Sequence, residues 1–245
     1  MTNSGVKVSI FIPAYNAVKH IEAVVARIPG PVREGLVSVW IVDDGSTDGT
    51  GELIDRMAER DPVIKPVHFA YNRGYGNAVG KGLELCRAEQ IDYAACIHAD
   101  GQYPPESIPL FVNHMREKGI DICQGSRIAS GTALSGGMPL YKYVSGKVLT
   151  FFENQAFKLH MTDYHSGFLV YSRKALESIP FDRLSRSFDF DLEVIASARA
   201  KGLIVDELPI PTRYAGEVSY LNPVTYGLRV VGVVMRYLVG GYSHL

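Results

Sequence analysis

Three features are scarce in this chain of 245 residues: cysteines, an excess of charge of one sign, and long apolar runs. It has 3 cysteines and no Cys-x-x-Cys pair, which argues against a disulfide framework and against a structural zinc site. The formal net charge of −1 argues against a nucleic-acid-binding protein, whose surface usually carries a basic stripe. No apolar run approaches the roughly 18 residues that a transmembrane helix needs.

What remains is a globular composition, with 47% hydrophobic and 21% charged residues. Cys86, Cys96 and Cys123 lie in apolar segments, so we expect buried free thiols and a reducing compartment. The amino-terminal stretch "MTNSGVKVSIF" has no signal-peptide layout. The sequence therefore favours a cytoplasmic protein, and it leaves open a peripheral position on the cytoplasmic face of a membrane.

Residues 6 to about 127 alternate between apolar, strand-like segments and segments with helical periodicity. Apolar strands that alternate with helices over short connections are typical of βαβ units. We therefore predict an α/β fold with a mostly parallel sheet flanked by helices on both faces. Ligands of such sheets bind outside the carboxyl ends of the strands. Polar residues gather at these ends: Asn16, Asp43, Asp44, Asn72, His98, Asp100, Gln102 and Arg127.

The stretch "CIHADGQYPPE" ends an apolar strand with His98, Asp100 and Gln102. If the segment is extended, side chains alternate with period two and these three project from one side. Nitrogen and oxygen ligands of this kind suit a divalent ion such as Mg²⁺ or Mn²⁺ and leave positions open for phosphate oxygens. The alternative is a loop before a helix in which the histidine has no ligand role.

Asp43 and Asp44 are adjacent carboxylates at the end of another predicted strand. Their side chains should point to opposite sides, so that one faces a ligand while the other holds the loop. The alternative is a turn at Asp44-Gly45-Ser46 followed by a helix cap. The later stretch "NRGYGNAVGKG" is a weak match to a dinucleotide fingerprint, because its third glycine, Gly80, comes one residue late. These glycines fit a loop and helix that pack closely beside a ligand.

Five stretches together resemble a known family: "VSIFIPAYN", "VWIVDDGSTDGT", "NRGYGNAVGKG", "HADGQYPPE" and "GSR", in order and at the usual spacings. They resemble family 2 inverting glycosyltransferases with the GT-A fold, and most closely the dolichol-phosphate mannose synthase-like branch. The resemblance implies metal-dependent transfer of a sugar from a GDP- or UDP-linked donor to a polyprenyl or dolichyl phosphate. It also implies one domain over 1–245, with a nucleotide-sugar-binding half (6–127), an acceptor half (128–222) and an amphipathic tail (223–245).

The resemblance assigns roles to individual positions. Asp100 and Gln102 would bind the Mn²⁺ or Mg²⁺ that bridges the donor diphosphate, and Arg127 would lie near the phosphates of donor or acceptor. The residues implied to contact the nucleotide-sugar are Pro13, Tyr15, Asn16, Asp43, Asp44, Asn72, Gly76 and Asp100. One departure stands out, because His98 occupies the place of the first aspartate of the family's Asp-x-Asp motif. A neutral imidazole can still ligate Mn²⁺ but brings no charge, and the alternative is that Asp100 and Gln102 hold the ion alone.

The acceptor decides whether the enzyme needs a base. A hydroxyl acceptor requires a general base, whereas a phosphate is already ionised at neutral pH. Family members that act on hydroxyls usually show a Glu-Asp pair opening a late helix, where this chain has "RSFDFDLEVIA" with Asp189 and Asp191. That pattern favours the polyprenyl-phosphate branch. The candidate catalytic residues are Asp100, Arg127, Asp163 and Asp191, and the candidate acceptor-binding residues are Arg127, Lys142, Ser166 and Arg213.

Two segments bear on membrane contact. Residues 140–161 have apolar side chains at helical spacing with interspersed lysines, which suits either an interfacial helix or a helix that covers the sheet. The tail "YGLRVVGVVMRYLVGG" is too short to span a bilayer, but it could dock on one or form a dimer interface. Two other functions stay open: transfer to a soluble hydroxyl acceptor, and a non-catalytic nucleotide-sugar binder.

Overall fold

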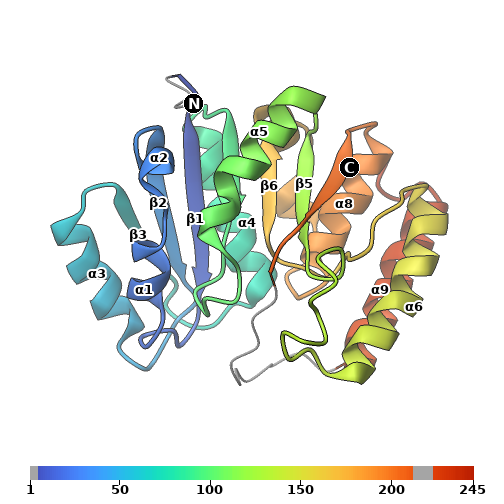
Figure 1. Cartoon of the computed structure of the whole chain (residues 1–245), viewed down its shortest axis with the longest axis horizontal. Helices are drawn as coiled ribbons and strands as arrows, with labels where there is room; N and C mark the ends of the chain where they lie inside the picture. The colour runs from blue at the N-terminus through green and yellow to red at the C-terminus, as the bar shows by residue number, and fades with distance from the viewer. Residues whose placement is uncertain (1–4, 212–222) are drawn as a thin grey trace.

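A single seven-stranded sheet forms the centre of the molecule (Figure 1). The computed structural model describes residues 5–211 and 223–245. The strands run in the order β3-β2-β1-β4-β6-β5-β7 across the sheet. Their bounds are β1 Val8–Ala14, β2 Leu36–Asp43, β3 Ile64–His68, β4 Tyr93–Cys96, β5 Ile122–Ser126, β6 Leu169–Ser172 and β7 Val205–Pro209. The predicted α/β fold with a mostly parallel sheet is confirmed.

Strand β6 is the exception to the parallel arrangement. It pairs antiparallel with both β4 and β5, whereas β1 pairs parallel with β2 and β4, and β5 pairs parallel with β7. The alternating pattern of residues 6–127 indicated neighbouring strands but gave no sign that a later strand would separate β4 from β5. This insertion brings the segment before β6 to the same edge of the sheet as the ends of β4 and β5.

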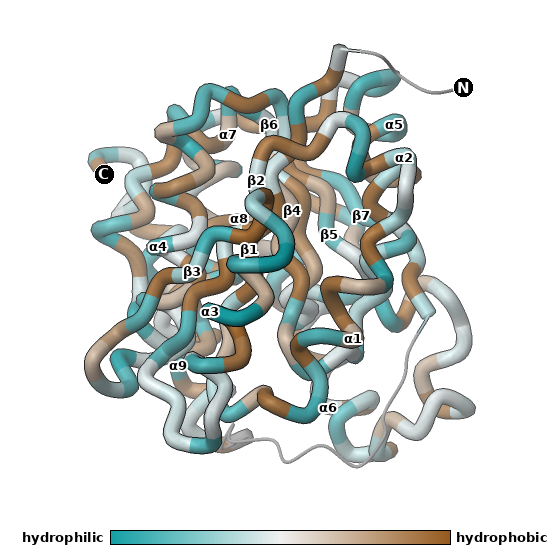
Figure 2. Tube along the Cα trace, turned by 90° about the vertical axis from the view of Figure 1, so that its left-hand side faces the viewer, coloured by the Kyte–Doolittle hydropathy of each residue, from teal (hydrophilic) through white to brown (hydrophobic). Residues whose placement is uncertain are grey.

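Helices cover both faces of the sheet, and the central strands are the hydrophobic part of the trace (Figure 2). One core contains β1 side chains such as Ile10 and Ile12 and packs against α1, α3 and α5, while the other contains Phe11 and packs against α4 and α8. The helices are α1 Ile21–Ala26, α2 Gly30–Arg33, α3 Thr50–Arg60, α4 Tyr75–Ala88, α5 Ile108–Lys118, α6 Leu140–Phe157, α7 Arg173–Ser178, α8 Phe190–Ala200 and α9 Pro223–Leu238, with 3-10 turns at Pro105–Ser107 and Phe181–Arg183. β1 alternates between the two cores because successive side chains of a strand point to opposite faces.

Helix α4 approaches β1 unusually closely. A Cβ at Gly82 would lie 2.4 Å from the ring of Phe11, so only glycine allows this distance between helix and sheet. The glycines of "NRGYGNAVGKG" therefore serve close packing, as the sequence predicted.

Helices α6 and α9 lie side by side at one end of the molecule (Figure 1). Helix α9 also packs against α8. Within residues 5–211 and 223–245, no helix combines the length and the apolar character that crossing a membrane requires.

Candidate functional site

A pocket of ≈ 680 Å³ lies where β4 and β5 end, bounded by α6 and α9. Much of the predicted chemistry meets here, although these residues are far apart in the sequence. The predicted site residues that line it are His98, Asp100, Gln102, Arg127, Lys142, Asp163 and Asp191. Of these, His98, Asp100, Gln102 and Arg127 are the residues that the rule of strand ends meeting at one edge predicted to lie together.

The segment from His98 to Gln102 is a turn, and the prediction of an extended segment with period-two side chains is wrong. Strand β4 already ends at Cys96. Gly101 has φ of 78°, and its N–H donates to the carbonyl of His98 at 3.4 Å. Oδ1 of Asp100 accepts a hydrogen bond from the backbone N–H of Gln102 at 3.0 Å. Asp and Gly favour such a turn, because Asp bonds its own loop and Gly tolerates positive φ.

His98 lies in an aromatic surround. Its Nε2 is 3.1 Å from the hydroxyl of Tyr75, and its ring meets Tyr103 edge-on at 4.9 Å between centroids. Gly167 adjoins the same ring, because a Cβ there would lie 2.3 Å from Cε1 of His98. Burial lowers the pKa of His98, which favours the neutral imidazole.

Asp100 and Gln102 offer the metal-binding chemistry of the turn. Both line the pocket, and their side chains supply a carboxylate and an amide oxygen. These hard oxygen donors fit Mg²⁺ or Mn²⁺ with most coordination positions left to water and diphosphate. Within the described ranges no cluster of three His, Cys, Asp or Glu residues could enclose a metal by itself. A metal held here would therefore depend on the ligand for much of its coordination.

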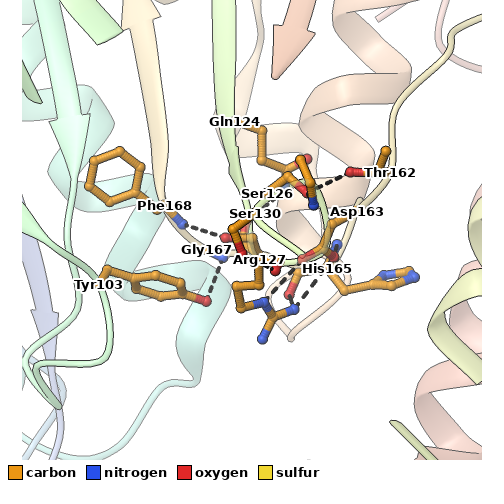
Figure 3. Close-up of polar contacts among 12 residues, drawn as sticks. Tyr103, Gln124, Ser126, Arg127, Ser130, Thr162, Asp163, His165, Gly167 and Phe168 are labelled. Atoms are coloured by element: carbon orange, nitrogen blue, oxygen red, sulfur yellow. Dashed lines mark hydrogen bonds and ion pairs between the residues drawn. The ribbon is translucent and has the colours of Figure 1, made fainter. Parts of the chain in front are cut away.

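Arg127 and Asp163 form a buried ion pair at the wall of the pocket (Figure 3). Nε of Arg127 donates to Asp163 Oδ2 at 3.0 Å, and one terminal nitrogen donates to the carbonyl of His165 at 2.9 Å. Burial alone would raise the pKa of Asp163, but the charge and hydrogen bonds of Arg127 outweigh it and hold the pKa below its usual value. The pair fixes a guanidinium beside the pocket.

Asp191 opens α8 and faces the pocket from the opposite wall. Its Oδ2 accepts a 2.6 Å hydrogen bond from the hydroxyl of Tyr75, while its buried Oδ1 has no partner among the described residues. Burial raises the pKa of this carboxyl to about 7, although the hydrogen bond from Tyr75 opposes the shift. A perturbed carboxyl with an unused oxygen in a pocket is typical of a functional group.

A second buried carboxyl, Glu153 of α6, lies behind the pocket. Its Oε2 is 3.5 Å from Nε2 of His165, whose Nδ1 lies 2.9 Å from the hydroxyl of Tyr226 on α9. Burial raises the pKa of Glu153 to about 9 and lowers that of His165 to about 4. Both shifts favour the neutral forms, so this contact is not an ion pair at neutral pH. It links both outer helices to the loop that carries Asp163.

Asp43 and Asp44 bond to different segments, and both hold loops, whereas the sequence predicted that one of them faces a ligand. Asp43 turns to its own loop and to the adjacent strand: its Oδ1 accepts from Ser46 N–H at 3.0 Å and its Oδ2 lies 3.3 Å from Nδ1 of His68. Both oxygens of Asp44 accept backbone N–H bonds, from Arg73 at 2.7 Å and Gly74 at 3.0 Å. Asp44 thereby joins the end of β2 to the loop before α4.

The other predicted nucleotide contacts lie near these carboxylates but outside the residues that line the pocket. Pro13 is in β1 and Tyr15 follows the strand, and Asn16 ties the loop after β1 to that after β2 through an acceptor bond from Thr47 N–H at 2.9 Å. Asn72 accepts from Gly74 N–H at 3.1 Å. Gly76 packs against Ser185, where a Cβ would lie 2.5 Å from the carbonyl oxygen.

One predicted acceptor contact, Ser166, does not line the pocket. Ser166 is fully buried, and its carbonyl accepts from the side-chain amide of Gln124 at 2.6 Å, so it supports the loop without lining the pocket. Arg213 lies outside the described residues. The predicted residues that reach the pocket therefore come from the turn after β4, from Arg127, α6 and α8, and from the loop before β6.

Sequence reasoning missed four residues that shape the site: Tyr75, Tyr103, His165 and Glu153. Tyr75 stands between two glycines of a quoted motif, and His165 lies within "TDYHSGF", so both were close to recognised signals. Glu153 is an acidic residue within the run "VLTFFENQAF", and a lone carboxylate in such a run was a usable signal. Tyr103 lies within the quoted stretch "HADGQYPPE", and its hydroxyl oxygen accepts a hydrogen bond from Gly167 N–H at 2.9 Å, which steadies the loop before β6 (Figure 3).

Comparison with known proteins places this geometry in a family. The family model described as glycosyl transferase family 2 matches residues 9–179. The dolichol-phosphate mannosyltransferase of Saccharomyces cerevisiae is 28% identical over 247 residues, covering 95% of this chain and 85% of that protein. A UDP-N-acetylglucosamine–dolichyl-phosphate N-acetylglucosaminyltransferase of Methanococcus voltae is 28% identical over 217 residues, 84% of this chain and 85% of the relative.

Solved structures show the same fold at lower identity. Glucosyl-3-phosphoglycerate synthase from Mycobacterium tuberculosis, in complex with Mn²⁺, UDP-glucose and phosphoglyceric acid, aligns with a TM-score of 0.71. The alignment has 17% sequence identity and covers 96% of this chain and 81% of that chain.

Proposed function

Since this chain belongs to glycosyl transferase family 2 and has the GT-A fold, it is a glycosyltransferase, and we propose that it transfers a sugar with inversion to a polyprenyl or dolichyl phosphate. The donor is a GDP- or UDP-linked sugar, and transfer requires Mn²⁺ or Mg²⁺. Several relatives bear names that specify dolichyl-phosphate or undecaprenyl-phosphate acceptors, which supports this choice.

The observation that carries the proposal is an apolar surface that adjoins the pocket. It is defined by the exposed apolar side chains of α6, of α9 and of the residue after α9, and it is called the α6/α9 surface: Leu140, Tyr141, Val144, Val148, Phe151, Phe152, Val224, Leu228, Val231, Met235, Leu238 and Val239. These positions recur every three or four residues, so each helix presents one exposed apolar stripe. Tyr141 and Val148 belong to this surface and also line the pocket.

A lipid bilayer is the occupant that we propose for this surface. The apolar stripe of α6 is accompanied by the exposed Lys147 and Lys158, a combination that suits an interface with anionic lipid headgroups. Polyprenyl chains are themselves embedded in a bilayer, so the surface would bring the pocket to its acceptor. The cytoplasmic location and the homo-oligomer remain predictions from the sequence.

The proposed reaction assigns distinct tasks to the pocket residues. The guanidinium of Arg127, held by Asp163, binds phosphate oxygens, for which its planar fork of donors is suited. Asp100 and Gln102 would hold the divalent metal, which supplies charge stabilisation for the leaving diphosphate. The acceptor phosphate attacks the anomeric carbon from the opposite face without a base, because it is already ionised. The flanking helices α6 and α9 keep bulk water from the donor sugar.

A second candidate is transfer to a hydroxyl acceptor, and one observation favours it. The pKa of Asp191 is raised to about 7, which is the range that suits a general base at neutral pH. This function would use Asp191 to take the proton of the attacking hydroxyl.

The deciding experiment compares acceptors and one surface substitution. We expect sugar transfer from GDP- or UDP-sugars to polyprenyl phosphate in anionic vesicles, and none to water-soluble hydroxyl acceptors. Phe152→Glu, at a side chain 59% exposed on the α6/α9 surface, should lower vesicle binding and transfer by about tenfold, since it places a charge in the interface. Leu110→Glu is the matched control, because this leucine is 56% exposed on α5. Equal effects of the two substitutions, or efficient use of a soluble acceptor, would contradict the proposal.

A further inference from the structure

A chain of three polar side chains crosses the pocket wall and joins the turn after β4 to the start of α8. Nε2 of His98 lies 3.1 Å from the hydroxyl of Tyr75, and this hydroxyl lies 2.6 Å from Oδ2 of Asp191. All three residues line the pocket. The chain therefore connects the position where the family's metal motif begins with the carboxyl of the opposite wall.

The donors and acceptors of this chain fit together in one order. Tyr75 has a single hydroxyl hydrogen, which it donates to Oδ2 of Asp191. Its oxygen is then left as a hydrogen-bond acceptor, and Nε2–H of His98, 3.1 Å away, can donate to it. Aspartate at position 98 could not complete this order, since an ionised carboxylate donates no hydrogen bond.

We propose that His98 is a positioning residue, which orients Tyr75 and through it Asp191, and that it is not a ligand of the metal. This inference rests on the proposed glycosyl transfer, and it leaves Asp100 and Gln102 as the metal-binding side chains. The departure from the family's Asp-x-Asp motif then has a role of its own: the side chain at the first position of the motif orients Tyr75 and Asp191 and does not bind the metal.

The packing around His98 supports this assignment. The ring meets Tyr103 and Tyr75 edge-on, with centroids 4.9 Å and 5.4 Å away, and it lies against Gly167. These contacts, together with the contact between Nε2 and Tyr75, hold the His98 ring in one orientation. Tyr75 is confined as well, because it stacks on Phe188 at 5.6 Å between centroids.

The oxygen of Asp191 that has no partner among the described residues indicates what the series His98, Tyr75 and Asp191 positions. Asp191 lines the pocket, and its buried Oδ1 has no hydrogen-bond partner among the described residues. A carboxylate repels phosphate, which excludes the diphosphate and the phosphate acceptor as its partners. The donors that remain in the proposed reaction are the hydroxyls of the transferred sugar. We therefore assign Asp191 to one hydroxyl of the hexose, held in place through Tyr75.

Three substitutions separate a positioning role from a metal-ligand role. Tyr75→Phe removes the central hydroxyl, His98→Asp restores the family's motif but removes the donor, and His98→Gln keeps an N–H that can reach Tyr75. Mn²⁺-dependent binding of UDP and of GDP is measured by calorimetry, and kcat and KM are measured for transfer. Asp100→Ala is the reference for loss of the metal.

We expect Mn²⁺-dependent nucleotide binding to stay within about threefold in all three variants and to fall at least about tenfold in Asp100→Ala. Turnover should fall by about 10- to 100-fold in Tyr75→Phe and His98→Asp, and His98→Gln should recover most of it. His98→Asp with full turnover, or with tighter Mn²⁺ binding, would overturn the proposal. So would His98→Gln with the binding defect of Asp100→Ala.

A spectroscopic measurement keeps this inference separate from the proposed function. In ¹⁵N-labelled protein, the His98 resonances, assigned by comparison with His98→Gln, should report a neutral ring protonated at Nε2 and should shift in Tyr75→Phe. Unchanged resonances in Tyr75→Phe would overturn the positioning role. Absence of transfer to polyprenyl phosphate would instead contradict the proposed acceptor and leave the spectroscopic result intact.

Discussion

The two sides of the strand-end edge are built differently. On the side of the predicted nucleotide contacts, Asp43, Asp44 and Asn16 each accept hydrogen bonds from backbone N–H groups of neighbouring loops. On the side of α6, α8 and α9, the polar side chains mostly contact other side chains. Glu153 and Asp191 retain buried oxygens without partners among residues 5–211 and 223–245.

On the first side the carboxylates already have their hydrogen-bond partners, whereas the second side has buried oxygens that a ligand can engage. Backbone donors fix the carboxylates of the first side independently of any bound molecule, so these loops are organised in advance. Buried polar groups without partners are costly, and natural proteins keep them mainly where a ligand or a proton transfer uses them. We call the side of the predicted nucleotide contacts the donor side and the side of α6, α8 and α9 the acceptor side, after the proposed function. The acceptor side should respond more strongly to substitution, to pH and to ligand than the donor side.

The largest effect is expected at the turn between the two sides. Asp100→Ala should lower turnover by about 10³-fold or more, because the leaving diphosphate loses the charge stabilisation that a divalent metal supplies. Steady-state transfer with Mn²⁺ and Mg²⁺ measures this loss. Asp182→Ala is the control, since this aspartate is exposed on a 3-10 turn. A fully active Asp100→Ala enzyme would contradict the assignment of the metal site to Asp100.

Arg127→Met should be the most destabilising change on the acceptor side. It leaves Asp163 buried without its cation, which should lower the free energy of unfolding by about 3–5 kcal/mol at pH 7. Because the folded-state pKa of Asp163 is depressed, its contribution is present above the unfolded value of about 3.9 and is lost as the pH falls through the folded value. Urea unfolding at pH 7 and pH 3 tests both statements.

The double variant Arg127→Met with Asp163→Asn is the control for that prediction. It should recover part of the stability, because no charge is left buried without a partner. If Arg127→Met unfolded with the same free energy at both pH values as the wild type, the buried ion pair would have no part in stability.

Glu153→Gln should raise the free energy of unfolding, whereas Arg127→Met lowers it. The carboxyl has a folded-state pKa of about 9 against 4.5 for the ordinary group, so the folded state binds more protons and stability falls as the pH rises between these values. The substitution removes that dependence and should stabilise the protein by roughly 1–3 kcal/mol at pH 8, with little effect near pH 5. Thermal unfolding across this range measures it, and a wild-type stability that is constant from pH 5 to 8 would contradict it.

The smallest effect is expected on the donor side, at His68. Burial lowers the pKa of this imidazole, but the hydrogen bonds that it donates to the carboxylates of Asp55 and Asp43, and their charges, outweigh burial and the net pKa is raised. Its contribution is therefore present below the unfolded value of about 6.5 and is lost as the pH rises through the folded value. The ring is 37% exposed, so solvent screens it and His68→Gln should cost less than about 1 kcal/mol at pH 6. A larger loss would remove the contrast between the two sides.

The sequence predicted the location of the site better than its internal contacts. Strand ends were sufficient to predict that Asp100 and Arg127 lie at one pocket, because parallel topology determines where strands end. That Asp43 and Asp44 contact different segments also followed from local alternation, which is a property of the backbone. Such inferences need no knowledge of distant partners.

The remaining features depend on tertiary contacts. Alternation failed at His98 because the backbone leaves the strand at Cys96 and turns at Gly101, where φ is positive. The partners of Tyr75 and Glu153 lie 116 and 12 positions away along the chain, in segments that no local pattern connects to them. Burial of a carboxyl and the resulting pKa shift are properties of the packed structure.

The position of β6 has a consequence for the order in which the chain can fold during synthesis. Strands β1 to β4 pair among themselves by residue 96, but β5 pairs only with β6 and β7, which follow it. When β5 leaves the ribosome it has no partner, and the edge of β4 stays open until residues 169–172 arrive. At ≈ 5–20 residues per second that interval lasts several seconds, during which an unpaired strand edge is exposed to other chains. The half of the sheet that holds Arg127 is thus completed last, after the donor side is already assembled.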